Sequence, residues 1–384
     1  MLFHTPDLDD QERAILATIV QLKRELDFMM TPGRWSGSLR RDTFARAVRG
    51  SNSIEGYDVS LDDARALVEG EQTLDAEVEA TVANNGYRAA MTLVLQKEDD
   101  PYFSYSYEFL NSLHFFMVGY DLTKNPGRWR PGAVFVYDDL REARVYEGPS
   151  IEIVPALMTE LISSLNTPGD THPIISAAMA HLNYVMIHPH SDGNGRMARC
   201  LQTLVLARGS MGRNPIFISI EEYLGRNTPE YYSVLLEVGG GSWHPTRDTR
   251  PWIRFCLRAH YRQAMTTKRR AEQWSRIFSL IEEEVRRRGI NDRSTIALAE
   301  AAYGFQIRNA TYRNSADVSD TLASRDLKDL VESGMLVPHG ERRGRYYTAG
   351  PSIVELTKQI PRAERPGDPF EEIGVEEQRL LFST

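Results

Sequence analysis

Apolar residues recur at helical spacing through most of this chain. Between residues 8 and 30 they stand mostly three or four positions apart, as at Ile15, Ile19, Leu22 and Leu26, which is typical of an amphipathic helix. Similar patterns predict helices over residues 40–55, 61–97, 105–118, 173–188, 252–255 and 268–288, with another helix after residue 195. Hairpin patterns are confined to residues 126–147 and the region near residue 340. The sequence therefore predicts a mainly α-helical protein.

Composition narrows the class further. The chain has 384 residues, with 41% hydrophobic and 26% charged residues, which indicates two or three ordinary globular domains. A net charge of −8 gives no global attraction to nucleic acid. The two cysteines, Cys200 and Cys256, lie in apolar helical stretches and favour a reducing compartment. No apolar run is long enough for a membrane span and the first residues carry no leader pattern, so we expect a cytoplasmic protein without membrane contact.

One polar stretch, residues 188–199, interrupts the apolar helices. Pro189 disfavours helical geometry at the residue before it, so the preceding helix should end at His188. Gly193 and Gly195 allow positive φ and a close approach of a ligand to the backbone. The stretch is therefore predicted to be a polar loop held between two buried helices.

The helix that follows this loop has the features of an anion site. Its first N–H groups and its dipole favour negative charge. Arg196 and Arg199 lie three positions apart in the first turn, and guanidinium groups match phosphate oxygens. Asp192 would repel a polyphosphate unless a cation lay between them, and Mg²⁺ held by one carboxylate and by phosphates meets that need. His188 can then act as general base on an incoming hydroxyl.

One other interpretation of the loop is excluded and two remain as alternatives. A P-loop is excluded, because the chain has no Gly-Lys-[Ser/Thr]. A zinc site has suitable ligand types in His181, His188, His190 and Asp192, but it leaves both arginines and both glycines unexplained. A plain connector between two helices is the structural alternative.

The loop resembles the central motif of the Fic family, HPFx[DE]GNGRxxR. The matching positions are His188, Pro189, Asp192, Gly193, Asn194, Gly195, Arg196 and Arg199. The sequence departs from the motif at His190, where the family usually has Phe. That Phe is commonly a packing residue, so we expect the departure to affect packing more than chemistry.

The resemblance implies a fold and a reaction. The expected fold is a Fic-type helical bundle with a β-hairpin flap. Most members transfer AMP from ATP to a hydroxyl side chain of a target protein. Carried over to this chain, the resemblance makes His188 the catalytic base and Asp192 the Mg²⁺ ligand.

The resemblance also implies how ATP binds. Gly193, Asn194 and Gly195 would form the nest for the phosphates, with Asn194 near the α-phosphate. Arg196 and Arg199 would clamp the outer phosphates.

A second, shorter motif lies upstream of the loop. Ser51-x-x-x-Glu55-Gly56 is similar to the family's inhibitory motif, [ST]xxxE[GN]. Taken alone, Glu55 is an ordinary solvated glutamate at a helix end. In members with this motif the glutamate pairs with the second motif arginine, here Arg199, and blocks the γ-phosphate site. The resemblance therefore implies an autoinhibited enzyme with an inhibitory helix in its own chain.

Residues 126–147 form the predicted hairpin. A structural ribbon is the plain interpretation. The segment is similar to the family's flap, which lies over the active site and can accept a target segment as an added strand. The resemblance thus implies a target protein docking on residues 126–147.

The last part of the chain looks like a winged helix. A helix over residues 318–333 is followed by a hairpin whose turn carries Arg342, Arg343 and Arg345. Such a domain often contacts DNA, and wing arginines can meet phosphates. Protein docking or dimerisation is the alternative, because the third helix mixes Arg325 and Lys328 with several acidic residues. A homodimer also stays open.

We therefore expect four regions: an N-terminal helical region (1–104), a catalytic core (105–265), a winged-helix-like domain (266–350) and a mobile acidic tail (351–384). The leading hypothesis is a protein adenylyltransferase held off by Glu55. A deAMPylating enzyme or a transferase with another nucleotide or phosphate donor would use the same site. A DNA-binding regulator that only senses nucleotide is the non-enzymatic alternative.

Overall fold

The computed structural model describes residues 1–30, 35–138, 142–167, 169–209, 215–341, 344–358, 360 and 365–373. Its α-helices are α1 (Asp10–Met29), α2 (Ser36–Ser53), α3 (Leu61–Val68), α4 (Val78–Leu95), α5 (Tyr107–Val118), α6 (Val154–Asn166), α7 (Pro173–Ile187), α8 (Asn194–Arg208), α9 (Glu221–Arg226), α10 (Thr228–Gly239), α11 (Arg250–Arg288), α12 (Thr295–Tyr303), α13 (Asn309–Ala316), α14 (Asp320–Glu332) and α15 (Pro351–Thr357). Short 3-10 helices are η1 (Leu122–Lys124), η2 (Ile151–Ile153), η3 (Pro215–Ile218) and η4 (Asp292–Ser294), and the strands are β1 (Phe135–Asp138), β2 (Ala143–Glu147), β3 (Leu336–His339) and β4 (Tyr346–Ala349). The prediction of a mainly α-helical protein is confirmed.

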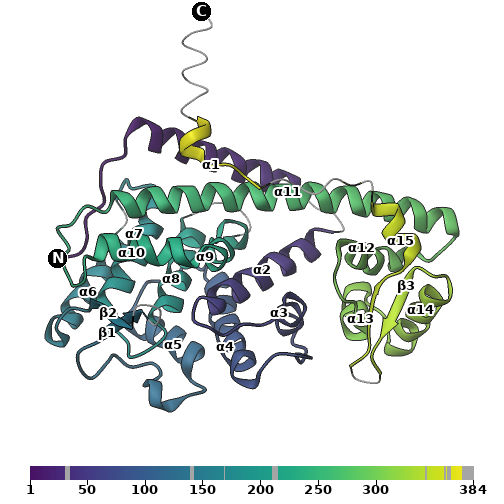
Figure 1. Ribbon diagram of the computed structural model, residues 1–384, viewed down its shortest axis with the longest axis horizontal. Helices are drawn as coiled ribbons and strands as arrows, with labels where there is room; N and C mark the ends of the chain where they lie inside the picture. Colours follow the sequence, from purple (N-terminus) through teal and green to yellow (C-terminus); the bar gives the residue numbers. More distant parts are fainter. Residues whose placement is uncertain are drawn as a thin grey trace, which may run out of the picture.

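Helix α11 is the longest element and runs past both the helical bundle and the C-terminal helices (Figure 1). Its buried side includes Trp252 and Trp274, neither of which is exposed. Gly289, with φ of 68°, ends it. The helix crosses residue 265 without a break, so the two regions expected to meet there share one continuous element. Within the described residues, no helix combines the length and apolar character needed to cross a membrane.

Helices α7 and α8 form the centre of the bundle and pack along one another. Helix α7 is buried on nearly every side because its sequence is apolar almost all round. The chain turns between them over residues 188–193, so the end of α7 and the start of α8 lie at the same end of the bundle. The polar loop predicted from the sequence is this turn.

Helices α2 and α9 meet with their backbones in contact. A Cβ on Gly50 would lie 2.6 Å from the carbonyl oxygen of Glu221, and one on Gly225 would lie 2.5 Å from the carbonyl oxygen of Gly50. Only glycine permits this approach at either position. The contact fixes the last turn of α2 against the bundle, close to the start of α8.

Helices α12–α14 and the β3–β4 hairpin form the C-terminal module. Ile307 and Tyr347 exchange two backbone hydrogen bonds of 2.8 Å, which adds a short third segment to the hairpin. The wing residues Arg342 and Arg343 lie outside the described residues.

The C-terminal module docks on α2 and α3 through charged residues. Arg41 of α2 donates to Glu300 of α12 at 2.9 Å and lies 3.1 Å from Glu69. Arg65 of α3 stacks over the ring of Phe305 at 3.5 Å. Because Glu300 is buried, these contacts couple the module to the helix that leads into Glu55.

Two segments differ from the sequence predictions. The single helix expected over residues 61–97 is two helices, α3 and α4, because the chain turns at Gly70 with φ of 79°. Part of the expected mobile tail packs on the body: α15 buries Ile353, and Asp368 pairs with Arg258 of α11 at 2.6 Å. The apolar anchor Ile353 and the charged anchor Asp368 hold these parts there, whereas residues 374–384 lie outside the described part of the chain.

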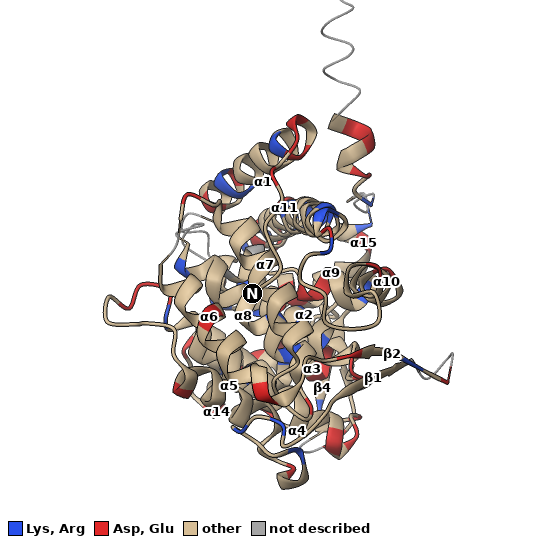
Figure 2. Cartoon of the chain, turned by 90° about the vertical axis from the view of Figure 1, so that its left-hand side faces the viewer, with Lys and Arg blue, Asp and Glu red and all other residues tan. Residues whose placement is uncertain are grey.

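The β1–β2 hairpin projects from the bundle beside α10 (Figure 2), as predicted for residues 126–147, although residues 139–141 at its tip lie outside the described residues. The end of β2 is covered, because the N–H of Glu147 donates to the carbonyl of Gly241 at 3.0 Å and Ser242 forms a bridge with Glu147. Among the described strands, none pairs with the outer edge of β1.

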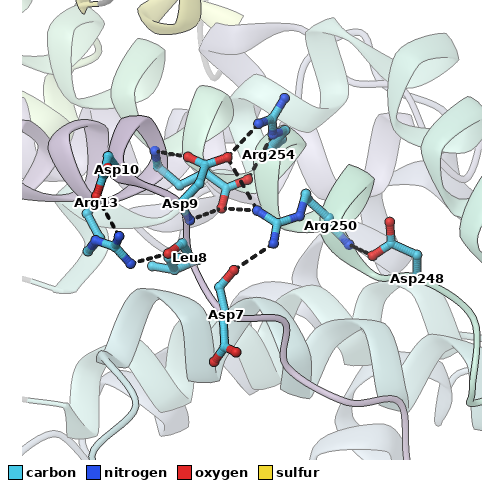
Figure 3. A network of polar contacts seen from close by, with 9 residues as sticks. Asp7, Leu8, Asp9, Asp10, Arg13, Asp248, Arg250 and Arg254 are labelled. Carbon is cyan, nitrogen blue, oxygen red and sulfur yellow. Dashed lines mark hydrogen bonds and ion pairs between the residues drawn. The ribbon is translucent and has the colours of Figure 1, made fainter.

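The start of α1 is fastened to the start of α11 by a charged network (Figure 3). Glu12 is fully buried and accepts hydrogen bonds from Arg250 at 2.7 Å and Arg254 at 2.8 Å. It also closes a capping box with Asp9. A buried carboxylate that meets two arginines and a helix N-terminus holds these two helices in register.

Replacing Glu12 with alanine should lower the free energy of unfolding by about 2 kcal/mol, because the change removes the capping box and the buried carboxylate that both arginines contact. The matched control is Glu25→Ala, since Glu25 pairs with Lys268 between the same two helices but is partly exposed. That control should cost less than about 1 kcal/mol. Urea denaturation of both variants measures the difference, and equal losses would contradict the assignment.

Candidate functional site

His188 stands at the end of α7 in a left-handed conformation, with φ of 52° and ψ of 58°. Pro189 prevents the helix from continuing, as predicted. The Nδ1 atom of His188 lies 3.0 Å from the carbonyl of Val185, so Nδ1 carries the hydrogen and Nε2 keeps its lone pair. Burial lowers the pKa of His188. The ring is therefore a neutral base at neutral pH, with Nε2 as the basic atom.

Asn194 and His190 close the loop on itself. The Oδ1 atom of Asn194 accepts from the N–H of His190 at 2.9 Å, and its Nδ2 donates to the carbonyl of His190 at 2.8 Å. The side chain expected near a phosphate is thus committed to the turn, and Asn194 offers a ligand its backbone N–H.

His190, which departs from the family motif, is part of a buried histidine pair. Its ring stacks on that of His114 with centroids 3.6 Å apart. The Nδ1 atom of His190 lies 2.8 Å from the carbonyl of Arg128, and its Nε2 lies 2.8 Å from the hydroxyl of Tyr184. A neutral ring with its hydrogen on Nδ1 satisfies both partners. His190 therefore fills a ring-shaped space and adds two hydrogen bonds that Phe cannot make.

The start of α8 is an unsatisfied positive region. Gly193 has φ of 76°, and the first intrahelical hydrogen bond runs from Met197 to Gly193, so the N–H groups before it have no helical partner. Arg196 is fully buried, and none of its three guanidinium nitrogens finds a hydrogen-bond partner among the described residues. An oxygen of Asp192 lies 3.9 Å away, which is too far for a hydrogen bond. A buried, unpaired guanidinium at a helix N-terminus is suited to an anionic ligand.

The structure brings Ser51 and Glu55 to Arg199. The Nε atom of Arg199 donates to the hydroxyl of Ser51 at 2.7 Å, and one terminal nitrogen donates to the Ser51 carbonyl at 2.9 Å and to Oε1 of Glu55 at 2.7 Å. A Cβ on Gly195 would lie 2.5 Å from Oε1 of Glu55. The carboxylate of Glu55 therefore lies directly on the first turn of α8, where an anionic ligand would bind.

Asp192 faces the other side of the same region and pairs with Lys124 at 3.0 Å. Burial raises the pKa of the Asp192 carboxyl, but the ammonium of Lys124 and the guanidinium of Arg196 outweigh burial, so the pKa is lowered. The carboxylate is therefore ionised. One partly exposed carboxylate suits Mg²⁺ that takes its other ligands from phosphates and water.

The zinc interpretation has no counterpart in the described part of the chain, where no three His, Cys, Asp or Glu side chains are placed to hold a metal. His181 instead lies in the core, 2.6 Å from Gln202 and 2.9 Å from the hydroxyl of Tyr231. Both of its ring nitrogens are thus engaged.

Arg130 was missed by the sequence analysis. It is buried, and it donates from its backbone N–H to Pro189 at 2.8 Å and from Nε to the carbonyl of His188 at 2.9 Å. Its terminal nitrogens meet the carbonyls of Gly132 and Pro149. One arginine therefore ties the His188 turn to the base of the hairpin. Nothing in the sequence sets Arg130 apart from Arg128 and Arg144 in the same segment.

The buried histidine pair predicts a pH dependence of stability. Burial lowers the pKa of His114 to about 4 and that of His190 well below its ordinary value. In the unfolded chain these two histidines bind protons below about pH 6.5, whereas in the folded chain they stay neutral until the pH is lower. Stability is thus fully present above that pH and falls as the pH drops toward the folded pKa. Each buried neutral histidine should account for about 2 kcal/mol of the loss at pH 5.

The variant His190→Phe should therefore lose about 2 kcal/mol less than the wild type between pH 7 and pH 5. Urea denaturation at the two pH values measures this difference and cancels any change common to both. The exposed residue His4 supplies the control, and His4→Phe should leave the pH dependence unchanged. An unchanged dependence in His190→Phe would mean that His190 takes up a proton in the folded state.

Comparison with known proteins finds a family that matches part of this chain. Residues 104–206 match the Fic/DOC family. The chain is 27% identical over 229 residues to the protein adenylyltransferase Fic of Nematostella vectensis, covering 57% of this chain and 47% of that protein. It is also 27% identical over 261 residues to the protein adenylyltransferase fic-1 of Caenorhabditis elegans, covering 65% and 46%. The chain thus spans about half the length of these curated relatives.

Solved structures share the fold. A Fic family protein from Desulfovibrio desulfuricans G20 superposes with a TM-score of 0.58 at 19% identity, covering 90% of this chain and 98% of that one. Fic-1 from C. elegans superposes with a TM-score of 0.51 at 25% identity, covering 67% and 71%. The matched segment contains His188, Asp192 and Arg196. Over residues 104–206, which hold the loop and the start of α8, the chain is thus similar to the Fic/DOC family.

Proposed function

We propose that this protein is an autoinhibited protein adenylyltransferase that moves AMP from ATP to a hydroxyl side chain of a target protein and releases pyrophosphate. The observation that carries the proposal is the buried guanidinium of Arg196, which lacks a hydrogen-bond partner among the described residues and lies one short loop away from the neutral base His188. Both curated relatives described above are named protein adenylyltransferases, which supports the choice of reaction.

In the proposed reaction each of these groups has one role. Nε2 of His188 takes the proton of the target hydroxyl, whose oxygen forms a bond to the α-phosphorus of ATP. The bond from that phosphorus to the oxygen bridging to the β-phosphate breaks, and pyrophosphate leaves. The N–H groups at the start of α8 and the guanidinium of Arg196 stabilise the negative charge of the phosphates. Mg²⁺ bound at Asp192 would add positive charge beside the leaving pyrophosphate.

The target is proposed to add a strand to the hairpin at β1. The end of β2 is already covered by Ser242, whereas no described strand pairs with the outer edge of β1. Main-chain pairing there would position a target hydroxyl by its place along the added strand, with little dependence on the target's side chains.

Inhibition is proposed to act by replacement of one anion with another. The carboxylate of Glu55 bonded to Arg199 takes the place of the terminal phosphate. ATP then cannot use Arg199, and its α-phosphate is not held against His188.

Label transfer from ATP labelled at the α-phosphate tests this proposal, with wild type, Glu55→Gly and Glu55→Gly/His188→Ala compared on a gel. Glu55→Gly should raise labelling at least roughly tenfold, since coupling free energies of this kind run to a few kcal/mol. Loss of His188 should lower labelling by roughly 100-fold or more. Asp58→Gly is the control, because Asp58 is an exposed carboxylate in the same segment, and it should behave as wild type.

Absence of label in every variant, while calorimetry still detects ATP binding, would reject AMP transfer. The site would then serve another nucleotide or phosphate donor, or sense nucleotide without turnover. Release of AMP from a labelled target in place of its attachment would identify the reverse, deAMPylating activity.

Arg130 should act as a positioning residue in this reaction. In the Glu55→Gly background, Arg130→Lys should lower kcat by roughly ten- to a hundredfold, because a lysine cannot hold several carbonyls at fixed angles and His188 shifts. KM for ATP should change less than about twofold, since Arg130 does not face the start of α8. A rise in KM with unchanged kcat would place Arg130 in nucleotide binding instead.

A further inference from the structure

Lys124 makes contacts that the proposed reaction does not use. Its ammonium lies 3.0 Å from Oδ2 of Asp192 and donates to the hydroxyls of Tyr57 at 2.9 Å and Tyr120 at 3.4 Å. The Lys124 side chain is only 17% exposed. One carboxylate and two hydroxyl oxygens surround its ammonium. The ammonium of Lys124 thus contacts Asp192, the carboxylate that the motif resemblance assigns to a metal ion.

Tyr57 joins this group of contacts to the inhibitory segment. It lies two residues after Glu55, its ring lies beneath the guanidinium of Arg196 at 5.1 Å, and its carbonyl accepts from Asn84 at 3.0 Å. The segment 55–57 therefore touches both sides of the site, with Glu55 on Arg199 and Tyr57 on Lys124.

We propose that Lys124 is a built-in replacement for the divalent cation, held on Asp192 in the inhibited state and fastened to the inhibitory segment by Tyr57. That this cation binds together with a nucleotide rests on the proposed function. Cation binding and withdrawal of the inhibitory segment then favour one another, because both release the same ammonium.

Lys124 and a divalent cation compete for Asp192 because their positive charges repel one another. A Mg²⁺ or Mn²⁺ ion binds a carboxylate oxygen at about 2.1 Å, and an ammonium 3.0 Å from the same oxygen would lie within a few ångströms of it. Two positive charges at that separation repel strongly in a partly buried site. Lys124 must therefore leave Asp192 before a divalent cation binds there.

The test measures Mn²⁺ binding to the full-length protein without nucleotide, from the electron paramagnetic resonance signal of free Mn²⁺. Lys124→Met should tighten binding by roughly tenfold, as expected for about 1.4 kcal/mol of relieved competition. Lys124→Arg keeps the positive charge and should stay near wild type. Tyr57→Phe keeps the ring and removes one acceptor, and should tighten binding by roughly threefold.

Two controls make the result specific. Lys97 forms a similar ion pair with Asp100 at 2.7 Å, away from the site, and Lys97→Met should change nothing. Adding Asp192→Asn to Lys124→Met should abolish the gain. Unchanged or weaker Mn²⁺ binding in Lys124→Met, with normal thermal unfolding, would overturn the inference.

This measurement uses neither ATP nor a target, so it separates the two proposals. A gain in Mn²⁺ affinity without label transfer in any variant would reject AMP transfer and keep the role of Lys124. Label transfer in Glu55→Gly without any gain in Lys124→Met would keep the reaction and reject the replacement cation.

Discussion

The positive charge buried at the start of α8 is the constraint on which the rest of this structure depends. Arg196 and Arg199 are 0% and 1% exposed, and the helix adds its own unpaired N–H groups. Buried charges of one sign are strongly unfavourable unless negative groups reach them. Glu55 pairs with Arg199, whereas Arg196 has no direct hydrogen bond to any residue that the structure describes. Glu55 on Arg199 and the phosphates of the proposed substrate are two alternative ways to neutralise this charge.

The fold places the carboxylate of Glu55 by fixing the helix before it. The backbone contact of Gly50 with α9 and the ion pairs of Arg41 with Glu69 and Glu300 hold α2 at both ends. The helix itself ends at Ser53, so Glu55 lies in the turn that follows. Under the proposed inhibition, Glu55 would leave Arg199 by a change in this short turn. The C-terminal module contacts the same helix through Arg41.

Local sequence signals were enough to predict the loop, but not the residues elsewhere in the chain that hold it in place. Pro189 and Gly193 mark the end of α7 and the start of α8, because both act on the backbone of adjacent residues. The approach of Glu55 to Arg199 followed only from the family resemblance. Lys124, Arg130 and Gly50 carry no pattern of their own, since each role depends on a contact with a residue more than fifty positions away. Likewise, periodicity predicted helix over residues 61–97 and missed the turn at Gly70, whose conformation is a property of one residue.

Under the proposed inhibition, the two contacts of residues 55–57 determine what a relieving ligand must carry. A bare anion can replace Glu55 on Arg199, yet it leaves the ammonium of Lys124 on Asp192, with the ring of Tyr57 still beneath Arg196. A bare cation can compete for Asp192, yet it adds positive charge beside two buried guanidinium groups. A ligand that carries both signs at a fixed separation, as a metal–polyphosphate does, satisfies both sides together. The arrangement of charges around α8 therefore discriminates against either half of such a ligand more strongly than any single contact would.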